Sequence, residues 1–109
     1  MKRLVFVALI IVLAVAGLAA YRFAQGLDAP YRGFVGVEQF VDIPPGIGPA
    51  AIGRLLVDAG VVADPFTWRV AVWRSGDAPI LKAGEYRFTE AMTPAEVIRK
   101  IARGEVYLR

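Results

Sequence analysis

The feature that most constrains this chain is an apolar run close to its N-terminus. Residues 4 to 20 read LVFVALIIVLAVAGLAA, and none of these 17 side chains is charged or polar. As a helix rising about 1.5 Å per residue, the run spans about 25 Å, which is close to the hydrocarbon thickness of a bilayer. The sequence therefore predicts a single transmembrane helix, extended by Tyr21, Phe23 and Ala24 to residue 24.

Charges beside the run predict its orientation. Lys2 and Arg3 precede it, and the positive-inside rule keeps such residues in the cytoplasm. Everything after Tyr21 is then predicted to lie across the membrane. The rival interpretation is a signal peptide cleaved near Ala14-Val15-Ala16. That site lies inside the apolar run rather than after it, so an uncleaved signal anchor is favoured.

Composition excludes several classes of function. The 109 residues suffice for one small domain and include no Cys and no His. Disulfides, a thiol nucleophile, an ordinary zinc site and a Ser-His-Asp triad are therefore excluded, and no cofactor or metal is expected. The net charge is +3, but without Lys2 and Arg3 only 11 basic residues face 10 acidic ones. These charges are interspersed rather than gathered in a basic stripe, so nucleic acid is not an expected partner.

The rest of the chain reads as a linker followed by a small α+β unit. Residues 25–36 lack periodicity and are predicted to be a juxtamembrane linker. Alternation predicts strands over 37–43 and 84–88, and Pro45-Gly46 suits the centre of a type II turn. Helices are predicted over 49–59, 65–75 and from 94 to 103, because each has Pro at its first position and Gly beyond its end. Asp64 is the predicted N-cap of the second helix, and Thr93-Pro94-Ala95-Glu96 predicts a capping box at the start of the third. Residues 106–109 resemble the start of another strand.

Apolar spacing predicts which helix faces are buried. The first helix presents Ile52, Leu55, Leu56 and Ala59, and the third presents Val97, Ile98 and Ile101. In the second helix the predicted buried stripe is Phe66, Val70 and Trp73. Trp68 lies off that stripe, which makes it a candidate for a contact surface, although packing on the linker or on a partner is the alternative.

Two further features are candidates for chemistry. Gly46-Ile47-Gly48 follows a strand and precedes a helix, as in a dinucleotide site, but the chain lacks the further parallel strands, so a plain turn is favoured. Glu85 is the one acid in an apolar and aromatic context. A catalytic carboxylate would need a second one facing it, and pairing with Lys82 or Arg87 at a sheet edge is the favoured interpretation.

Several of these segments together resemble the endolytic murein transglycosylases, the YceG-like family. The resemblance rests on the following strings, which extend over nearly the whole chain: Val41-Asp42-Ile43-Pro44-Pro45-Gly46, Ile52-x-x-Leu55-Leu56-x-x-Ala59-Gly60-Val61-Val62, Phe66, Ser75-Gly76, Leu81-Lys82-Ala83-Gly84-Glu85-Tyr86-Arg87-Phe88 and Met92-Thr93-x-x-Glu96-Val97-x-x-x-Ile101-x-x-Gly104.

The resemblance implies an inner-membrane protein whose single anchor (1–24) and linker (25–36) carry a LysM-like β-α-α-β module (37–90) in the periplasm. Residues 91–109 would then be a helix and the start of a strand leading to a catalytic domain beyond this chain. Family members cleave nascent glycan strands to 1,6-anhydro-muramyl ends with a glutamate of that later domain. No residue here is therefore expected to be catalytic.

Peptidoglycan glycan strands are the partner that the resemblance implies. By analogy with LysM modules, the turn 44–48 and the segment 75–83 are where glycan would bind. Pro45, Gly46, Trp68 and Glu85 are the candidate contacts with glycan or with a partner. The alternative is a non-catalytic membrane adaptor that docks cell-wall synthesis or division proteins.

Overall fold

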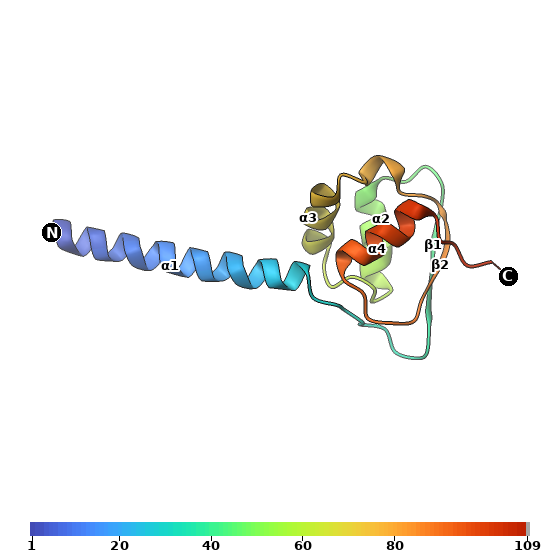
Figure 1. Cartoon of the computed structure of the whole chain (residues 1–109), viewed down its shortest axis with the longest axis horizontal. Helices are drawn as coiled ribbons and strands as arrows, with labels where there is room; N and C mark the ends of the chain where they lie inside the picture. The colour runs from blue at the N-terminus through green and yellow to red at the C-terminus, as the bar shows by residue number, and fades with distance from the viewer. Residues whose placement is uncertain (109) are drawn as a thin grey trace.

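The computed structural model describes residues 1–108 and consists of a long N-terminal helix joined to a small α+β module (Figure 1). The elements follow in the order α1 (Lys2–Leu27), β1 (Gln39–Ile43), α2 (Pro49–Asp58), α3 (Pro65–Ser75), the 3₁₀ helix η1 (Ala78–Ile80), β2 (Gly84–Phe88) and α4 (Pro94–Arg103). The predicted fold class is confirmed, since an apolar N-terminal helix precedes a β-α-α-β unit and a further C-terminal helix.

Helix α1 projects away from the module, and its 26 residues span about 39 Å. Its apolar side chains are exposed along almost the whole length, and its most apolar stretch is not buried against the module at all. Within residues 1–108 it is the one helix long and apolar enough to cross a membrane. A helix that is apolar on every side needs an apolar surrounding, which a bilayer provides.

The two strands form an antiparallel pair in which Val41 faces Tyr86 and Ile43 faces Gly84. The strand predicted over 84–88 is confirmed, whereas the first strand begins at Gln39 rather than at residue 37. Gly36 adopts a left-handed φ of 103°, which turns the chain just before the strand, and Val37 remains exposed.

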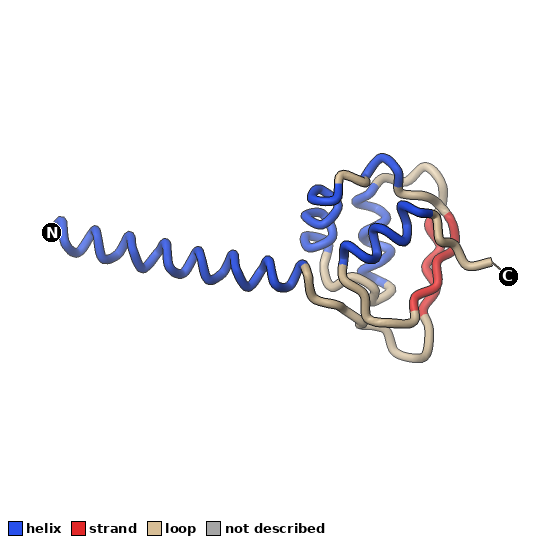
Figure 2. The backbone as a smooth tube through the Cα atoms, viewed as in Figure 1, coloured by secondary structure: helices blue, strands red, loops and turns tan. Residues whose placement is uncertain are grey.

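The module has three layers (Figure 2). The strands lie on the side away from α1, α3 lies on the side nearest α1, and α2 and α4 lie between them. A single apolar core joins all three layers and includes Val41, Ile43, Ile52, Leu56, Trp68, Val72, Tyr86, Phe88, Val97, Ile98 and Ile101. The predicted buried faces of α2 and α4 are thus confirmed.

The helix ends confirm the local sequence signals. The Asp64 carboxylate accepts a hydrogen bond of 2.8 Å from the backbone N–H of Thr67, which caps α3. Thr93 and Glu96 form a reciprocal capping box at the start of α4. Gly76 ends α3 in the left-handed conformation that favours glycine.

The segment between α1 and β1 packs on the module. Helix α1 continues past residue 24 to Leu27, and Tyr31 then pairs with Met92. The Gly33 N–H donates to the Gly60 carbonyl at 2.8 Å, and Phe34 enters the core. The Arg32 guanidinium donates to the carbonyls of Thr89, Phe34 and Gly36 and lies 4.2 Å from the centre of the Phe34 ring. These bonds hold the segment against the module.

The strand predicted near the C-terminus is wrong over residues 106–108. This part of the chain contains no strand, although the Tyr107 N–H donates to the Glu85 carbonyl at 2.8 Å. Arg109, the last residue of that prediction, lies outside the described residues.

The predicted buried face of α3 is also wrong. Phe66 and Trp73 are 58% and 81% exposed, while Trp68 is only 2% exposed. The side of α3 in the core carries Thr67, Trp68, Ala71 and Val72. Helix α3 is apolar on two opposite faces, so spacing alone does not reveal which face meets the core.

Candidate functional site

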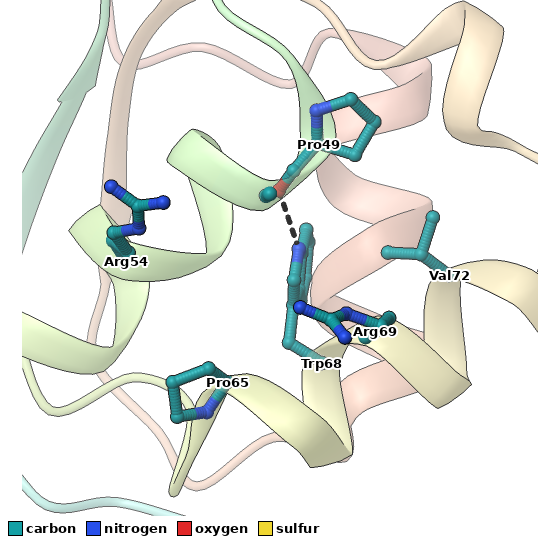
Figure 3. Close-up of a pocket in the computed structure, with 7 residues that line it drawn as sticks. Pro49, Arg54, Pro65, Trp68, Arg69 and Val72 are labelled. Carbon is teal, nitrogen blue, oxygen red and sulfur yellow. Dashed lines mark hydrogen bonds between the residues drawn. The ribbon is translucent and has the colours of Figure 1, made fainter.

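A groove of about 420 Å³ opens between the start of α2 and the first two turns of α3 (Figure 3). Most of its lining is apolar, and two arginines complete it. The lining residues are Pro49, Ala50, Arg54, Pro65, Trp68, Arg69 and Val72. Apolar walls with a few polar groups are typical of a ligand-binding site.

Trp68 stands at the centre of the groove, and its position is fixed. Its indole N–H donates to the Pro49 carbonyl at 2.8 Å, which joins α3 to the first turn of α2 (Figure 3). The ring fits because Gly53 faces it: a Cβ at this position would lie 2.2 Å from the Trp68 Cδ1. Trp68 therefore supports the groove from within the core and is not the exposed contact expected from the sequence.

The groove carries positive charge. Arg54 extends from α2 and Arg69 from α3, and both side chains are exposed (Figure 3). No acidic side chain is among the described residues that line the groove. The N-terminus of α2 also lies here, and no side chain caps it, so its backbone dipole adds positive potential. This arrangement suits a partly apolar ligand that carries an anionic group.

Asp64 directly precedes Pro65 in the chain and caps the N-terminus of α3. Both of its oxygens accept hydrogen bonds from Thr67, one from the backbone N–H and one from the hydroxyl, each at 2.8 Å. The backbone hydrogen bond is the main cause that lowers the pKa of Asp64 below its usual 3.8. Asp64 is therefore ionised at neutral pH and is engaged in holding α3.

The other candidate contacts lie at one end of the sheet. Because Ile43 faces Gly84, the turn after β1 leaves the sheet where the segment before β2 enters it. Pro45 and Gly46 are exposed in that turn, and Gly46 takes a φ of 86° as a type II turn requires. The groove lining does not include them, although Pro49 follows the same turn.

Glu85 lies on the outer face of the sheet, directly opposite Asp42. Arg87, one of its two predicted partners, has its Nε 3.1 Å from a carboxylate oxygen of Glu38. Among residues 1–108, no three His, Cys, Asp or Glu side chains gather in a way that could hold a metal ion.

Sequence reasoning missed the groove itself. Arg54 and Arg69 lie on different helices, and each alone reads as an ordinary exposed residue. The one local signal was Gly53, a helix-interior glycine, which often marks a close approach of another side chain.

Comparison with known proteins supplies the context for this site. No protein-family model matches the chain, and no curated protein matches it. A solved structure does match: the crystal structure of a YceG-like protein from Listeria monocytogenes, with a TM-score of 0.60 and 27% sequence identity over 64% of this chain. The chain is similar to a YceG-like protein.

The predicted resemblance to the YceG-like family is confirmed by this similarity. The single apolar helix α1 also fits the membrane anchor that the resemblance implied. The chain spans 23% of the length of the Listeria YceG-like protein.

Proposed function

We propose that this chain is the membrane-anchored N-terminal segment of an endolytic peptidoglycan transglycosylase. In this proposal α1 is the anchor, and the module holds the enzyme close to its glycan substrate. The observation that carries the proposal is the similarity of this chain to a YceG-like protein, together with a helix in the same chain that is able to cross a membrane. Cleavage of the glycan belongs to the catalytic domain of the complete protein.

The proposed orientation follows from charge. Lys2 and Arg3 lie before the apolar run and favour a cytoplasmic N-terminus in the inner membrane. The module, with the proposed boundaries 37–90 and followed by residues 91–109, then lies in the periplasm or an equivalent extracytoplasmic space. Peptidoglycan is assembled in that space, so the location agrees with the proposed substrate.

The groove is the proposed place of glycan contact. Peptidoglycan combines sugar rings, which pack on apolar walls, with carboxylates on its peptide stems. Pro49, Ala50 and Pro65 offer such walls, and Arg54 and Arg69 offer guanidinium groups to the carboxylates. A glycan strand that leaves the groove past Pro49 would continue toward the end of the sheet. The proposed contacts there remain Pro45, Gly46 and Glu85.

Co-sedimentation with purified insoluble peptidoglycan tests the proposal, with the full chain in mild detergent. We expect the unmodified chain to be retained, and Arg54→Ala with Arg69→Ala to weaken retention by about tenfold, as loss of two exposed guanidinium contacts implies. Arg99→Ala with Arg103→Ala, on the exposed side of α4, is the control with the same charge change.

Each outcome decides a different part of the proposal. An unmodified chain that stays in solution contradicts glycan binding. An equal loss in both double variants means that binding follows net charge and not the groove. Trp68→Ala is unsuitable here, because truncating a side chain that is 2% exposed would disrupt the core.

A further inference from the structure

Helix α3 carries an apolar stripe on the face opposite the core. Phe66, Val70 and Trp73 are spaced at i, i+4 and i+7, so they line up along one side of the helix. Phe66 is 58% and Trp73 is 81% exposed, although aromatic side chains of this size gain most from being covered. Arg69 and Arg74 flank the stripe on its two sides, and both are exposed.

The stripe continues onto the membrane helix. The ring of Phe66 lies 5.3 Å from the ring of Phe23 in α1, measured between centroids. A second contact joins the same two helices, because Arg74 Nη1 lies 3.8 Å from an Asp28 carboxylate oxygen just after α1 ends. In Figure 1, α3 is the helix of the module nearest α1 and lies on the side from which α1 extends.

We propose that the Phe66–Val70–Trp73 stripe rests on the bilayer surface beside the anchor, with its side chains in the interfacial region of the outer leaflet. This inference rests on the proposed role of α1 as a membrane anchor. The stripe would lie at the level where Tyr21 and Phe23 leave the apolar run. Trp, Tyr and Phe favour that level because their rings are amphipathic or polarisable, and arginines bind lipid phosphates there.

The size of the stripe favours lipid over a protein partner. One aromatic side chain buries about 150–250 Å², so the two exposed aromatic side chains, Phe66 and Trp73, offer at most about 500 Å², and the half-buried Val70 between them adds little. A stable protein interface needs about 800 Å² from each partner. Contact with the bilayer needs less area, because α1 already holds α3 next to the membrane and the entropic cost of association is therefore small.

Docking in this way would fix how the module sits on the membrane. The sheet would face away from the bilayer, since the strands lie on the opposite side of the module from α3 (Figure 2). Trp68 and Arg69 of α3 line the groove. Because α3 would rest on the bilayer, the groove would open close to the membrane surface.

Spin labelling of the full chain in lipid nanodiscs, with one chain per disc, tests the proposal. The chain has no Cys, so a single introduced Cys carries the only label. Val70→Cys places it within the stripe, Leu13→Cys within the anchor, and Asp58→Cys on the exposed surface of α2. The readout is the ratio of collisions with oxygen, which dissolves in lipid, to collisions with a water-soluble nickel complex.

We expect the ratio at Val70 to be several-fold higher than at Asp58 and lower than at Leu13. Adding Phe66→Glu and Trp73→Glu should reduce the Val70 ratio to that of Asp58. A ratio at Val70 equal to that at Asp58, with Leu13 still in lipid, would overturn the docking proposal and leave the anchor intact. A water-exposed Leu13 would overturn the anchor itself. A Val70 label shielded from both reagents would mean that protein covers the stripe, which also contradicts the proposal.

Discussion

Replacing Gly53 by alanine tests whether the close packing of α2 on Trp68 holds the groove in shape. An added Cβ would lie 2.2 Å from Trp68 Cδ1 and 2.7 Å from its Nε1, closer than atoms approach without displacement. The indole has little room to move, because it is 2% exposed and hydrogen-bonded to Pro49 at 2.8 Å. The substitution must therefore either shift the ring or separate the two helices.

Three effects set the size of the change. Overpacking of a core costs about 1–3 kcal/mol, and a weakened indole hydrogen bond costs about 1 kcal/mol more. Alanine is the better helix former and recovers about 1 kcal/mol. We therefore expect Gly53→Ala to lower the free energy of unfolding by about 2 kcal/mol, which corresponds to a Tm lower by roughly 10 °C.

A double-mutant cycle isolates the cause. Urea denaturation of the full chain in mild detergent, followed by circular dichroism, gives the free energy of unfolding for Gly53→Ala alone, Trp68→Leu alone and both together. Because leucine has neither the indole ring nor its N–H, Gly53→Ala should cost little in the Trp68→Leu background. An equal loss in both backgrounds, or no loss in the native background, would refute the reasoning.

Other predictions concern the caps and the contacts that hold the module together. Asp64→Ala should lower the free energy of unfolding by about 1 kcal/mol at pH 7. Because the pKa of Asp64 is lowered in the folded state, the Asp64 cap stabilises the fold above pH 3.8 and stops doing so as the pH falls through the lowered pKa. The free energies of unfolding of the unmodified chain and of Asp64→Ala, measured by urea titration, should therefore converge in acid. Tyr86→Phe removes the hydroxyl that donates to the Lys82 carbonyl at 2.8 Å. This hydroxyl lies where burial raises the pKa of Tyr86, so its lost hydrogen bond should lower the Tm by roughly 5 °C in calorimetry. Arg32→Ala should loosen the segment before β1, so hydrogen exchange of the Gly33 amide should quicken roughly fivefold while core amides are unchanged; an unchanged Gly33 rate would contradict this role of Arg32.

Much of the fold was predictable because its signals are local. The Asp64 cap, the Thr93–Glu96 capping box and the glycines after the helices depend on residues within one turn of each other, and the structure confirms them. The buried faces of α2 and α4 were predictable for a similar reason, since each of these helices has one apolar side.

The buried face of helix α3 could not be predicted from local signals. Both of its faces are apolar at helical spacing, and the choice between them depends on Gly53 and the Pro49 carbonyl, which belong to another helix. The groove was hidden for the same reason, because it exists only where α2 and α3 pack together. The segment before β1 lacked periodicity, yet Arg32 and Phe34 fasten it through contacts with residues far along the chain.

The central claim is that α1 crosses the membrane and holds the module on the outer side. Labelling of single introduced cysteines in spheroplasts with a membrane-impermeant maleimide tests it most directly, because the chain has no Cys of its own. We predict that Asp58→Cys, exposed on α2, is labelled in intact spheroplasts, whereas Lys2→Cys is labelled only after the membrane is permeabilised. Labelling of Lys2→Cys in intact spheroplasts, with Asp58→Cys protected until permeabilisation, would contradict the account.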